Sequence, residues 1–407
     1  MRVLIVTAGS RGDVAPFTGL GQRLQQAGHQ VAIAAHGPFA ELIRRCGVEF
    51  RLLPGDPVEM ARERLAAPSP EAGRSVFAGF VHRLGEGLIA TTAAGTDLII
   101  TAFGPAPVSR LVAEGFGIPS IGAYLVPAVP TAEFPLPGWP EPEDLGPVGN
   151  LAAGRELIGR AGALYADVLP RLRARLGLPA ATTTEPADGS PPDGWPICHG
   201  FSPAVIPRPD DWPPEVQVTG YWWPARPAGW QPPGELLDFL QAGAPPVFIG
   251  FGSIAPSEGE SLTELIAAAV NRAGVRAVVQ AGWAGLAPVG DGILPVGDLP
   301  HDWLFPRMAA VVHHAGAGTT GAGLRAGVPA VIVPILLDQP FWAARLHQLG
   351  VAPPPLPQRD LTANALADAM RCCIDDQTYR NQAVQLARRI RAEDGSAAVL
   401  TLIDGLR

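Results

Sequence analysis

The chain has 407 residues, a formal net charge of −8 at pH 7, and hydrophobic residues at 47% of its positions. This length corresponds to two or three domains, and an acidic chain lacks the basic face that a dedicated nucleic-acid binder needs. No lysine occurs, so all 30 basic residues are arginines, which excludes a P-loop lysine and a Schiff-base lysine.

The four cysteines form no CxxC pair, which favours a reducing, cytoplasmic compartment. No apolar run approaches the roughly 20 residues that a membrane span requires, so we expect no integral membrane segment.

The first elements in chain order follow a strand, loop, helix, strand pattern. Residues 3–7 form a continuous apolar run, typical of a strand that is buried on both faces of a parallel sheet. Residues 9–13 are predicted to be a loop, and a helix is expected to begin near Pro16. Residues 31–35 then form the next strand.

The same pattern returns in the second half of the chain. Residues 247–250 and 275–279 are predicted strands, with a helix over residues 262–272 between them. A tract rich in proline and tryptophan, residues 207–234, separates the two halves, while residues 126–147 and 181–194 are expected to be loops. The repetition predicts two doubly wound α/β domains.

The strongest local signal is the segment 311–320, VVHHAGAGTT, in which an apolar strand leads into small residues and then into a helix over residues 321–326. Glycines let a ligand approach the backbone, and the N–H groups at a helix start favour phosphate. His314 and Thr319 add side-chain donors. A tight strand–helix turn without a ligand is the alternative. The adjacent histidines point to opposite faces of a strand, so no metal site is expected.

Two acidic positions each allow two interpretations. Asp338 and Gln339 follow the buried strand of residues 327–334, where they could bind hydroxyl groups of a ligand, although Asp338 could equally cap a helix. Asp13 lies in the first loop, where its carboxylate could act as a general base or could cap the helix that follows.

Six segments together resemble the family 1 nucleotide-sugar glycosyltransferases, with the sterol glucosyltransferases and the actinobacterial antibiotic (vancomycin-group type) glycosyltransferases as the nearest branches. The segments are residues 9–17, 250–253, 300–305, 311–320, 323–329 and 338–342. The resemblance implies the GT-B fold, which is α/β with two Rossmann-like domains that face each other across a cleft. It implies an acceptor-binding domain over residues 1–215, a linker over 216–234, a nucleotide-sugar-binding domain over 235–390, and a C-terminal helix over 391–407 that crosses back to the first domain.

The resemblance also assigns roles to residues. Asp13 would be the general base, and Asp338 and Gln339 would bind the sugar hydroxyls. Trp283 and Leu299 would contact the nucleobase and ribose. The donor diphosphate would be bound by Ser10, Arg11, Gly252, Ser253, His314, Gly316, Ala317, Gly318 and Thr319. Two positions depart from the pattern of the sterol branch, because Ala315 and Leu337 stand where that branch has glycine.

The activity implied is an inverting, metal-independent transfer of a hexose, with UDP-glucose as the expected donor and a dTDP-deoxysugar as the alternative. The nucleotide sugar is a co-substrate, so no cofactor is expected. The acceptor would be a hydrophobic hydroxylated molecule such as a polyketide, macrolide, flavonoid or sterol-like compound. Its pocket would be lined by Phe77, Phe80, Phe134 and Trp139. We expect a cytoplasmic monomer or weak homodimer.

Two other classes of function remain open. A dinucleotide-dependent epimerase or reductase would need Gly-x-Gly-x-x-Gly after the first strand, whereas the loop here reads Gly-Ser-Arg-Gly-Asp. A glycosyltransferase-like auxiliary protein without catalysis is the second, and the joint presence of Asp13, His314, Asp338 and Gln339 argues against it.

Overall fold

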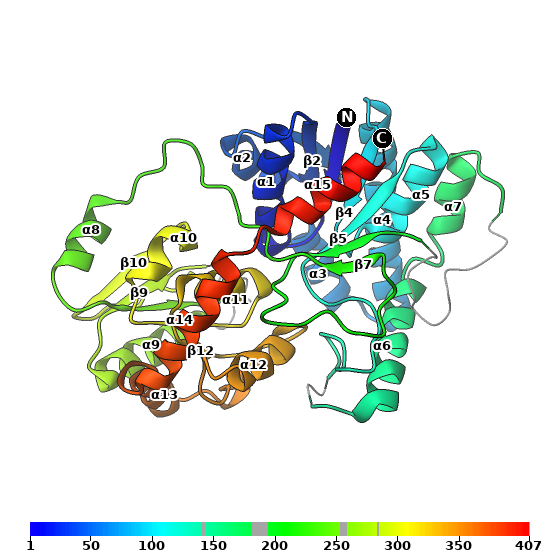
Figure 1. Cartoon of the computed structure of the whole chain (residues 1–407). Helices are drawn as coiled ribbons and strands as arrows, with labels where there is room; N and C mark the ends of the chain where they lie inside the picture. Colours follow the sequence, from blue (N-terminus) through cyan, green and yellow to red (C-terminus); the bar gives the residue numbers. More distant parts are fainter. Residues whose placement is uncertain (141–142, 181–193, 253–258, 283–284, 407) are drawn as a thin grey trace. The chain divides into compact units, whose positions relative to one another are not determined.

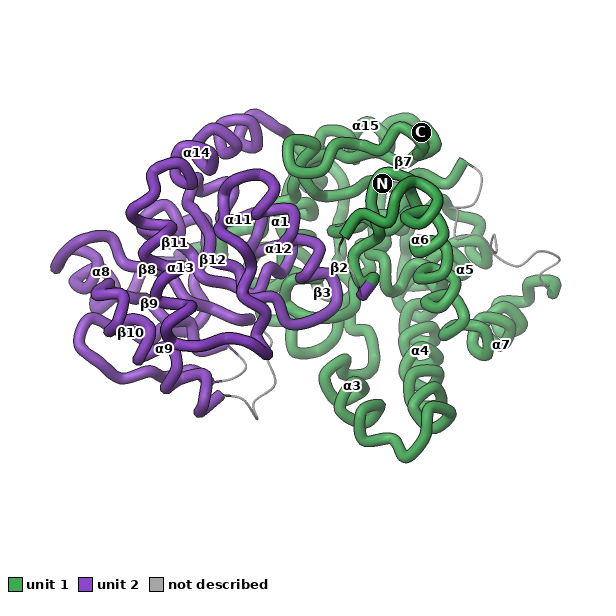
Figure 2. The backbone as a smooth tube through the Cα atoms, turned by 90° about the horizontal axis from the view of Figure 1, so that it is seen from below, with its two compact units in different colours: residues 1–139, 143–228, 394–407 green, residues 140–142, 229–393 purple. Residues whose placement is uncertain are grey.

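The computed structural model describes residues 1–140, 143–180, 194–252, 259–282 and 285–406. The chain divides into two compact units (Figure 2). Unit 1 contains residues 1–139, 143–228 and 394–407, and unit 2 contains residues 140–142 and 229–393.

Unit 1 is built on a seven-stranded sheet in the order β3-β2-β1-β4-β5-β6-β7, and all of its strand pairs are parallel. Its strands are β1 (Arg2–Val6), β2 (Gln30–His36), β3 (Glu49–Leu53), β4 (Leu98–Thr101), β5 (Ser120–Tyr124), β6 (Ile197–His199) and β7 (Val216–Val218). Its helices are α1 (Arg11–Gln26), η1 (Gly37–Phe39), α2 (Ala40–Arg45), α3 (Pro57–Leu65), α4 (Pro70–Ala93), α5 (Ala106–Phe116), α6 (Gly146–Ala163), α7 (Leu169–Arg175) and α15 (Gly395–Gly405). Strand β7 lies inside the range 216–234 that the sequence assigned to a linker.

Both faces of the unit 1 sheet are buried, as the continuous apolar run in β1 predicts. Val3 and Ile5 pack with Phe17 of α1 and Val399 of α15 on one face. The alternate residues of β1, Leu4 and Val6, form the core on the other face together with helices α4 and α5. Figure 1 shows α15 beside α1, at the end of the chain. The Trp222 indole N–H donates to the Gly395 carbonyl over 2.8 Å and ties the start of α15 to unit 1.

The predicted starts of two helices are wrong. Helix α1 begins at Arg11, five residues before Pro16, because Ser10 caps it and Asp13 completes a capping box. Pro16 therefore lies inside the helix. The helix after the second histidine begins at Ala317, four residues before the predicted Gly321. In both places a glycine that suggests a loop, Gly12 in α1 and Gly318 in α11, lies in the first turn of the helix.

Unit 2 has a five-stranded parallel sheet in the order β10-β9-β8-β11-β12. Its strands are β8 (Val247–Gly250), β9 (Ala277–Gln280), β10 (Ile293–Val296), β11 (Ala310–His313) and β12 (Ala330–Ile332). Its helices are α8 (Gly234–Gln241), α9 (Gly259–Ala273), α10 (His301–Leu304), η3 (Phe305–Arg307), α11 (Ala317–Ala326), α12 (Gln339–Gln348), η4 (Gln358–Asp360), α13 (Ala363–Asp375) and α14 (Gln377–Arg391). No helix in the described ranges is both long enough and apolar enough to cross a membrane.

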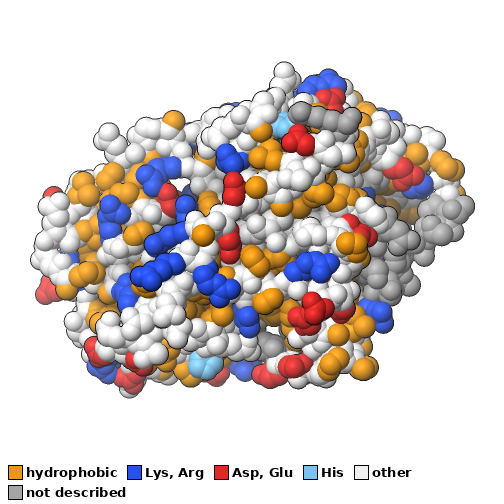
Figure 3. Space-filling model, in the orientation of Figure 1, with side chains coloured by type: hydrophobic (Ala, Val, Ile, Leu, Met, Phe, Trp, Pro, Cys, Tyr) orange, Lys and Arg blue, Asp and Glu red, His pale blue; other side chains and the backbone are white. Residues whose placement is uncertain are grey.

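Helix α11 is held at its carboxyl end by α14. The Arg391 guanidinium donates to the carbonyl oxygens of Arg325, over 2.7 Å, and Ala326, over 3.1 Å. These are carbonyl groups that a helix end leaves without partners, and a cation is favoured there by the helix dipole. Arginine side chains gather on the face of unit 2 that carries α11 and α14 (Figure 3). The arrangement fixes the axis of α11, whose amino end reaches the candidate site.

Candidate active site

The candidate residues follow the strands at which the order of each sheet reverses. In unit 1 the reversal lies between β1 and β4, and in unit 2 it lies between β8 and β11. In open α/β sheets, ligands bind outside the carboxyl ends of the strands at this point. Asp13 belongs to the connection that leaves β1, and Gly252 and His314 belong to the connections that leave β8 and β11. Each unit therefore carries one candidate site by itself.

In unit 1, Asp13 is the third residue of α1 and turns back onto the loop before the helix. Its Oδ2 accepts the Ser10 N–H over 2.6 Å and the Ser10 hydroxyl over 2.9 Å. Gly9 has φ +136, and a Cβ at that position would lie 2.3 Å from Asp13 Oδ2. Glycine is thus required before Ser10 for the carboxylate to reach its place.

The surroundings of Asp13 raise the pKa of its carboxyl, because desolvation outweighs the hydrogen bonds from Ser10 that lower it. A general base works best when its pKa approaches the operating pH, so this direction suits proton abstraction. The capping interpretation also holds in part, since Asp13 is the acidic member of the capping box while Ser10 is the N-cap residue. The capping-box contact is therefore observed, and the general-base role stays a prediction.

In unit 2, the imidazole of His314 lies between two glycines. A Cβ at Gly252 would lie 2.7 Å from His314 Cε1, and a Cβ at Gly316 would lie 2.6 Å from His314 Nε2. Burial lowers the pKa of His314 to about 4, so the ring is neutral at pH 7. Its Nδ1 is buried and makes no hydrogen bond of normal geometry among the described residues, although the Gly250 backbone lies close enough to the ring to oppose the fall in its pKa. A buried ring nitrogen without a partner fits a ligand that supplies one.

The amino end of α11 is open to a ligand. Gly316 is its N-cap residue, and neither a side-chain cap nor an acidic first-turn residue is present in the described part of the chain. The N–H groups of residues 317–319 have no hydrogen-bond partner among the described residues. These groups carry the positive end of the helix dipole, so they can hold a phosphate. The amino end of α1 differs, because Ser10 and Asp13 already occupy it.

Asp338 and Gln339 lie between β12 and α12 and are held by neighbouring groups. Asp338 precedes α12 but makes no side-chain cap, so the capping interpretation of this residue is wrong. Its Oδ2 accepts the Trp342 indole N–H over 3.0 Å. Gln339 Oε1 accepts the N–H groups of Ile335, over 2.8 Å, and Leu336, over 3.2 Å. The amide nitrogen of Gln339 has no partner among the described residues and can donate to a hydroxyl.

Ala315 and Leu337, the two departures noted in the sequence, are the non-glycine residues with positive φ in the described ranges. Ala315 has φ +67 and Leu337 has φ +58. This left-handed conformation is unfavourable for residues with a Cβ, by roughly 1–2 kcal/mol each. Ala315 is fully buried, whereas Leu337 is 72% exposed and follows the exposed Leu336. The loops around the candidate site are therefore strained at both positions.

Other candidate residues are dispersed. Ser253 and Trp283 lie outside the described residues, and Leu299 is half-buried two residues before α10. Arg11 is exposed at the start of α1. The predicted acceptor-pocket residues lie in unit 1. Phe80 is buried against His36, with ring centroids 5.3 Å apart.

The remaining predicted pocket residues are half-buried. Phe77 meets Tyr165 edge to face at 5.6 Å, and Trp139 lies 6.0 Å from the Arg160 guanidinium. Phe134 is half-buried in the segment that precedes α6.

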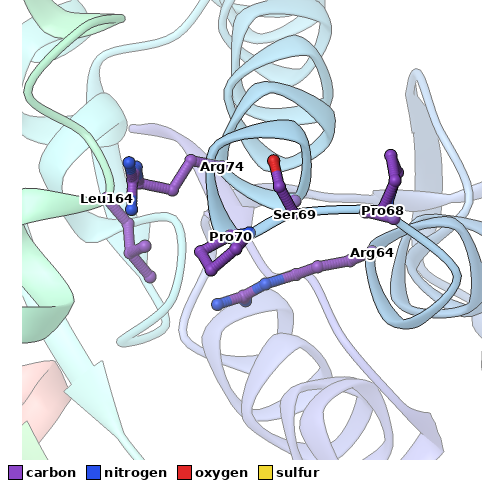
Figure 4. Close-up of a pocket in the computed structure, with 8 residues that line it drawn as sticks. Arg64, Pro68, Ser69, Pro70, Arg74 and Leu164 are labelled. Carbon is purple, nitrogen blue, oxygen red and sulfur yellow. The ribbon is translucent and has the colours of Figure 1, made fainter.

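A cavity of about 520 Å³ opens between the α3–α4 hairpin and Leu164 (Figure 4). Arg64, Ser69 and Arg74 line it, and the Arg64 guanidinium also lies 5.6 Å from the centroid of the Phe77 ring. None of the residues predicted from the sequence lines this cavity. It therefore neighbours the predicted acceptor region without being part of it.

The sequence reasoning missed two residues of these sites. Trp342 positions Asp338 through its indole N–H, and its place four residues after Asp338, one turn of helix away, was a usable signal. Phe103 follows β4 at the strand end that neighbours β1, and no sequence signal separates it from the other aromatic residues of the first half. In the described ranges no cluster of three or more histidine, cysteine or acidic residues could hold a metal ion.

Two family models match the chain, one in each half. Residues 3–135 match the glycosyltransferase family 28 N-terminal domain. Residues 264–403 match the erythromycin biosynthesis protein CIII-like, C-terminal domain.

Related proteins match nearly the whole chain. A sterol 3-beta-glucosyltransferase of Arabidopsis thaliana is 36% identical over 98% of this chain, which spans 64% of that protein's length. The O-mycaminosyltylonolide 6-deoxyallosyltransferase of Streptomyces fradiae is 36% identical over 99% of this chain and 97% of its own. A solved glycosyltransferase of Streptomyces sp. SF2575, SsfS6, complexed with thymidine diphosphate, covers 100% of this chain and 99% of its own, with a TM-score of 0.67 and 22% identity.

Proposed function

The chain belongs to the family 1 GT-B glycosyltransferases, and from this premise we propose that it transfers a hexose from a nucleoside diphosphate to a hydroxyl of a hydrophobic small molecule. One observation carries the proposal. The buried Nδ1 of His314, a donor in the tautomer that carries its proton there, and the N–H groups that open α11 make no hydrogen bond of normal geometry in the described structure. Both follow β11 at the reversal of the unit 2 sheet. Donors of this kind suit the oxygens of a diphosphate.

In the proposed reaction, the bond between the sugar C1 and the diphosphate oxygen breaks while a bond forms between C1 and the acceptor oxygen. The diphosphate takes the bonding electron pair, and the neutral His314 ring and the α11 N–H groups stabilise its developing charge. The Asp13 carboxylate accepts the proton of the acceptor hydroxyl. Attack on the face of C1 opposite the leaving group inverts the anomeric centre. Asp338 and the Gln339 amide bind the sugar hydroxyls.

This proposal assigns no metal ion to the diphosphate. The positive charge that a divalent ion would supply is replaced by the helix dipole and by fixed N–H donors, which need no reorganisation during the reaction.

The donor has two candidates. A glucosyl group is favoured by the sterol 3-beta-glucosyltransferases among the relatives, and UDP-glucose is the donor of this sugar that we propose. A TDP-linked deoxysugar is favoured by the Streptomyces fradiae relative, whose name specifies a 6-deoxyallosyl group, and by the thymidine diphosphate in the SsfS6 complex.

Calorimetric titration of the protein with UDP and with TDP, each with and without EDTA, tests the donor site. We expect one nucleotide to bind, with equal affinity in both conditions. A nucleotide affinity that disappears with EDTA and returns with magnesium would contradict the metal-independent proposal. Incubation of UDP-glucose and TDP-glucose with a panel of hydroxylated polyketides, flavonoids and sterols, followed by mass spectrometry, then tests transfer. The proton NMR spectrum of the glycoside reports whether the anomeric centre is inverted.

A further inference from the structure

Phe103 occupies the position in unit 1 where the fold places a ligand. The Ala102 N–H donates to the Val6 carbonyl over 2.9 Å, so the ladder between β4 and β1 continues to Ala102. Phe103 is the first residue beyond that ladder. Asp13 belongs to the connection that leaves β1, the neighbouring strand. The phenyl ring and the carboxylate therefore come from the two connections that flank the reversal of the sheet.

The ring is fixed in place and still open to solvent. Phe103 is 37% exposed. It meets the buried Tyr124 edge to face, with ring centroids 5.3 Å apart and an interplanar angle of 85°. The next residue is also held, because the Tyr165 hydroxyl donates to the Gly104 carbonyl over 2.5 Å. Tyr165 in turn contacts Phe77, a residue of the predicted acceptor pocket.

Phe103 differs from the aromatic side chains behind it. Tyr124 packs against His199, and His199 stacks on Trp212 with centroids 4.6 Å apart. These three are buried, and burial lowers the pKa of His199 to about 3, so its ring is neutral. Phe103 continues this aromatic row into solvent, beyond the carboxyl end of the central strand β4. A single exposed phenylalanine is ordinary, but this one follows the strand next to β1, whose own connection carries the candidate general base.

Phe116 provides the comparison within the same unit. It is 38% exposed, almost the same as Phe103, and it is the last residue of α5. Helix α5 starts just after Phe103 and is 11 residues long, so Phe116 lies about 15 Å away along the helix. It has the same side chain and the same exposure, but it lies away from the carboxyl end of β4.

We propose that Phe103 is the platform on which a ring of the acceptor lies while the acceptor hydroxyl meets Asp13. The proposal rests on the proposed function and adds the acceptor class, an alcohol or phenol whose hydroxyl is attached to a flat or rigid apolar ring system. Aromatic stacking and burial of the ring supply the affinity, and the direction of the Phe103 ring sets which hydroxyl is presented. Phe103 thus determines acceptor specificity through binding.

The test measures acceptor binding and turnover in Phe103→Ala, Phe103→Trp and Phe116→Ala. The ring probes are 4-methylumbelliferone, kaempferol and testosterone, and the acyclic probe is 1-octanol. Affinities are measured by saturation-transfer NMR with UDP or TDP at saturation, and KM and kcat are measured for each glycoside formed. We expect Phe103→Ala to raise the Kd and KM for a ring probe about tenfold or more, with kcat changed much less. Phe103→Trp retains ring binding, and Phe116→Ala behaves as wild type.

The outcomes separate the two proposals. If UDP and TDP fail to bind to the wild-type protein, the proposed function fails and this inference fails with it. If a nucleotide binds but none of the ring probes does, or if Phe103→Ala keeps the wild-type affinity for a ring probe, the platform is refuted while the proposed function stands. An equal loss of 1-octanol and ring binding in Phe103→Ala would also refute it, because a general disturbance of the pocket would then explain both. Urea unfolding of each variant shows that the fold is intact.

Discussion

Replacing Asp13 with asparagine separates its proposed chemical role from its structural one. The carboxylate is the proposed proton acceptor, whereas an amide is not a base at neutral pH. A general base contributes typically about 10²–10⁴-fold, so we expect kcat to fall by this factor. The affinity for UDP or TDP should not change, because the proposed diphosphate ligands are His314 and the N–H groups of α11 in unit 2.

The structure predicts a small change in stability for the same substitution. The asparagine Oδ1 can accept the Ser10 N–H that Asp13 Oδ2 accepts over 2.6 Å, so the capping box is kept. Loss of the charge beside the helix dipole costs roughly 0.3–1 kcal/mol, and relief of the desolvated carboxylate acts in the opposite direction. We expect the free energy of unfolding to stay within about 1 kcal/mol of wild type. Asp13→Ala would also lose the hydrogen bonds that Ser10 donates to the carboxylate, at about 1 kcal/mol.

The raised pKa of Asp13 adds a pH dependence with a defined sign. Because the carboxyl binds its proton more tightly in the folded state, its contribution to stability is complete below the unfolded pKa of about 3.9. That contribution is lost as the pH rises through the folded pKa, and Asp13→Asn removes this loss. Activity has the opposite dependence, since the base must be deprotonated. The rate should therefore fall on acidification with an apparent pKa above that of an ordinary aspartate.

Single-turnover glycoside formation, followed by mass spectrometry between pH 4 and 8, measures the rate, and urea unfolding over the same pH range measures the stability. The matched control is Asp56→Asn, which alters another helix-capping aspartate of unit 1, whose Oδ1 accepts the Val58 N–H over 2.8 Å. This variant should keep the wild-type rate and pH profile. Turnover near the wild-type rate in Asp13→Asn would refute the assignment of the base, and a rate loss matched by a collapse in stability would refute the separation of the two roles.

Three further substitutions test the rest of the reasoning. His314→Ala should weaken UDP or TDP binding, measured by calorimetry, about 10–100-fold, because a hydrogen bond to a charged group contributes about 1.5–3 kcal/mol. An unchanged affinity would contradict the assignment of His314 to the diphosphate. Leu337→Gly should raise the free energy of urea unfolding by about 0.5–1 kcal/mol, because relief of the left-handed backbone exceeds the entropy that glycine adds to the unfolded chain. Leu336→Gly, at the exposed neighbouring position, should lower it. A buried histidine whose pKa falls to about 3 lowers the free energy of unfolding by about 1.4 kcal/mol per pH unit on acidification from pH 6.5 to 4. His199→Phe should therefore reduce this loss of stability in urea unfolding. An unchanged dependence of the free energy of unfolding on pH would contradict this.

The strands at the centre of each sheet could be predicted because their apolar runs are continuous. Strand β8 has the predicted bounds, and β1 and β2 differ from the prediction by one residue at each end. Strands β6 and β7 have three residues each and lie near or within proline-rich segments. Such short runs carry no periodicity, so their place in the sheet depends on the pairing of β6 with β5 and of β7 with β6, which a single sequence does not reveal.

The starts of α1 and α11 were misplaced for a different reason. Ser10 and Asp13 have the three-residue spacing of a capping box, but the glycines between and beside them favoured a loop.

Phe103 could not be distinguished from the other aromatic residues of the first half. Its proposed role depends on the exposure of its ring and on the strand that lies next to β4, and neither can be predicted from the sequence. Sequence locates the strand ends, whereas the exposed fraction of each side chain requires the fold.

The strain at Ala315 and Leu337 persists because neighbouring groups hold each loop. The Ala315 N–H donates to His313 Nδ1 over 3.1 Å, and burial keeps that ring neutral by lowering its pKa to about 3, so the acceptor is available at physiological pH. The loop before Leu337 is held by the two N–H groups that Gln339 Oε1 accepts. The hydrogen bonds that offset the unfavourable φ thus come from residues next to, or within, the proposed donor site. Glycine at either position would remove the strain, but it would also leave the backbone around His314 or Asp338 freer to move. Stability and the fixed geometry of the donor site are therefore expected to change in opposite directions when these two residues are replaced by glycine.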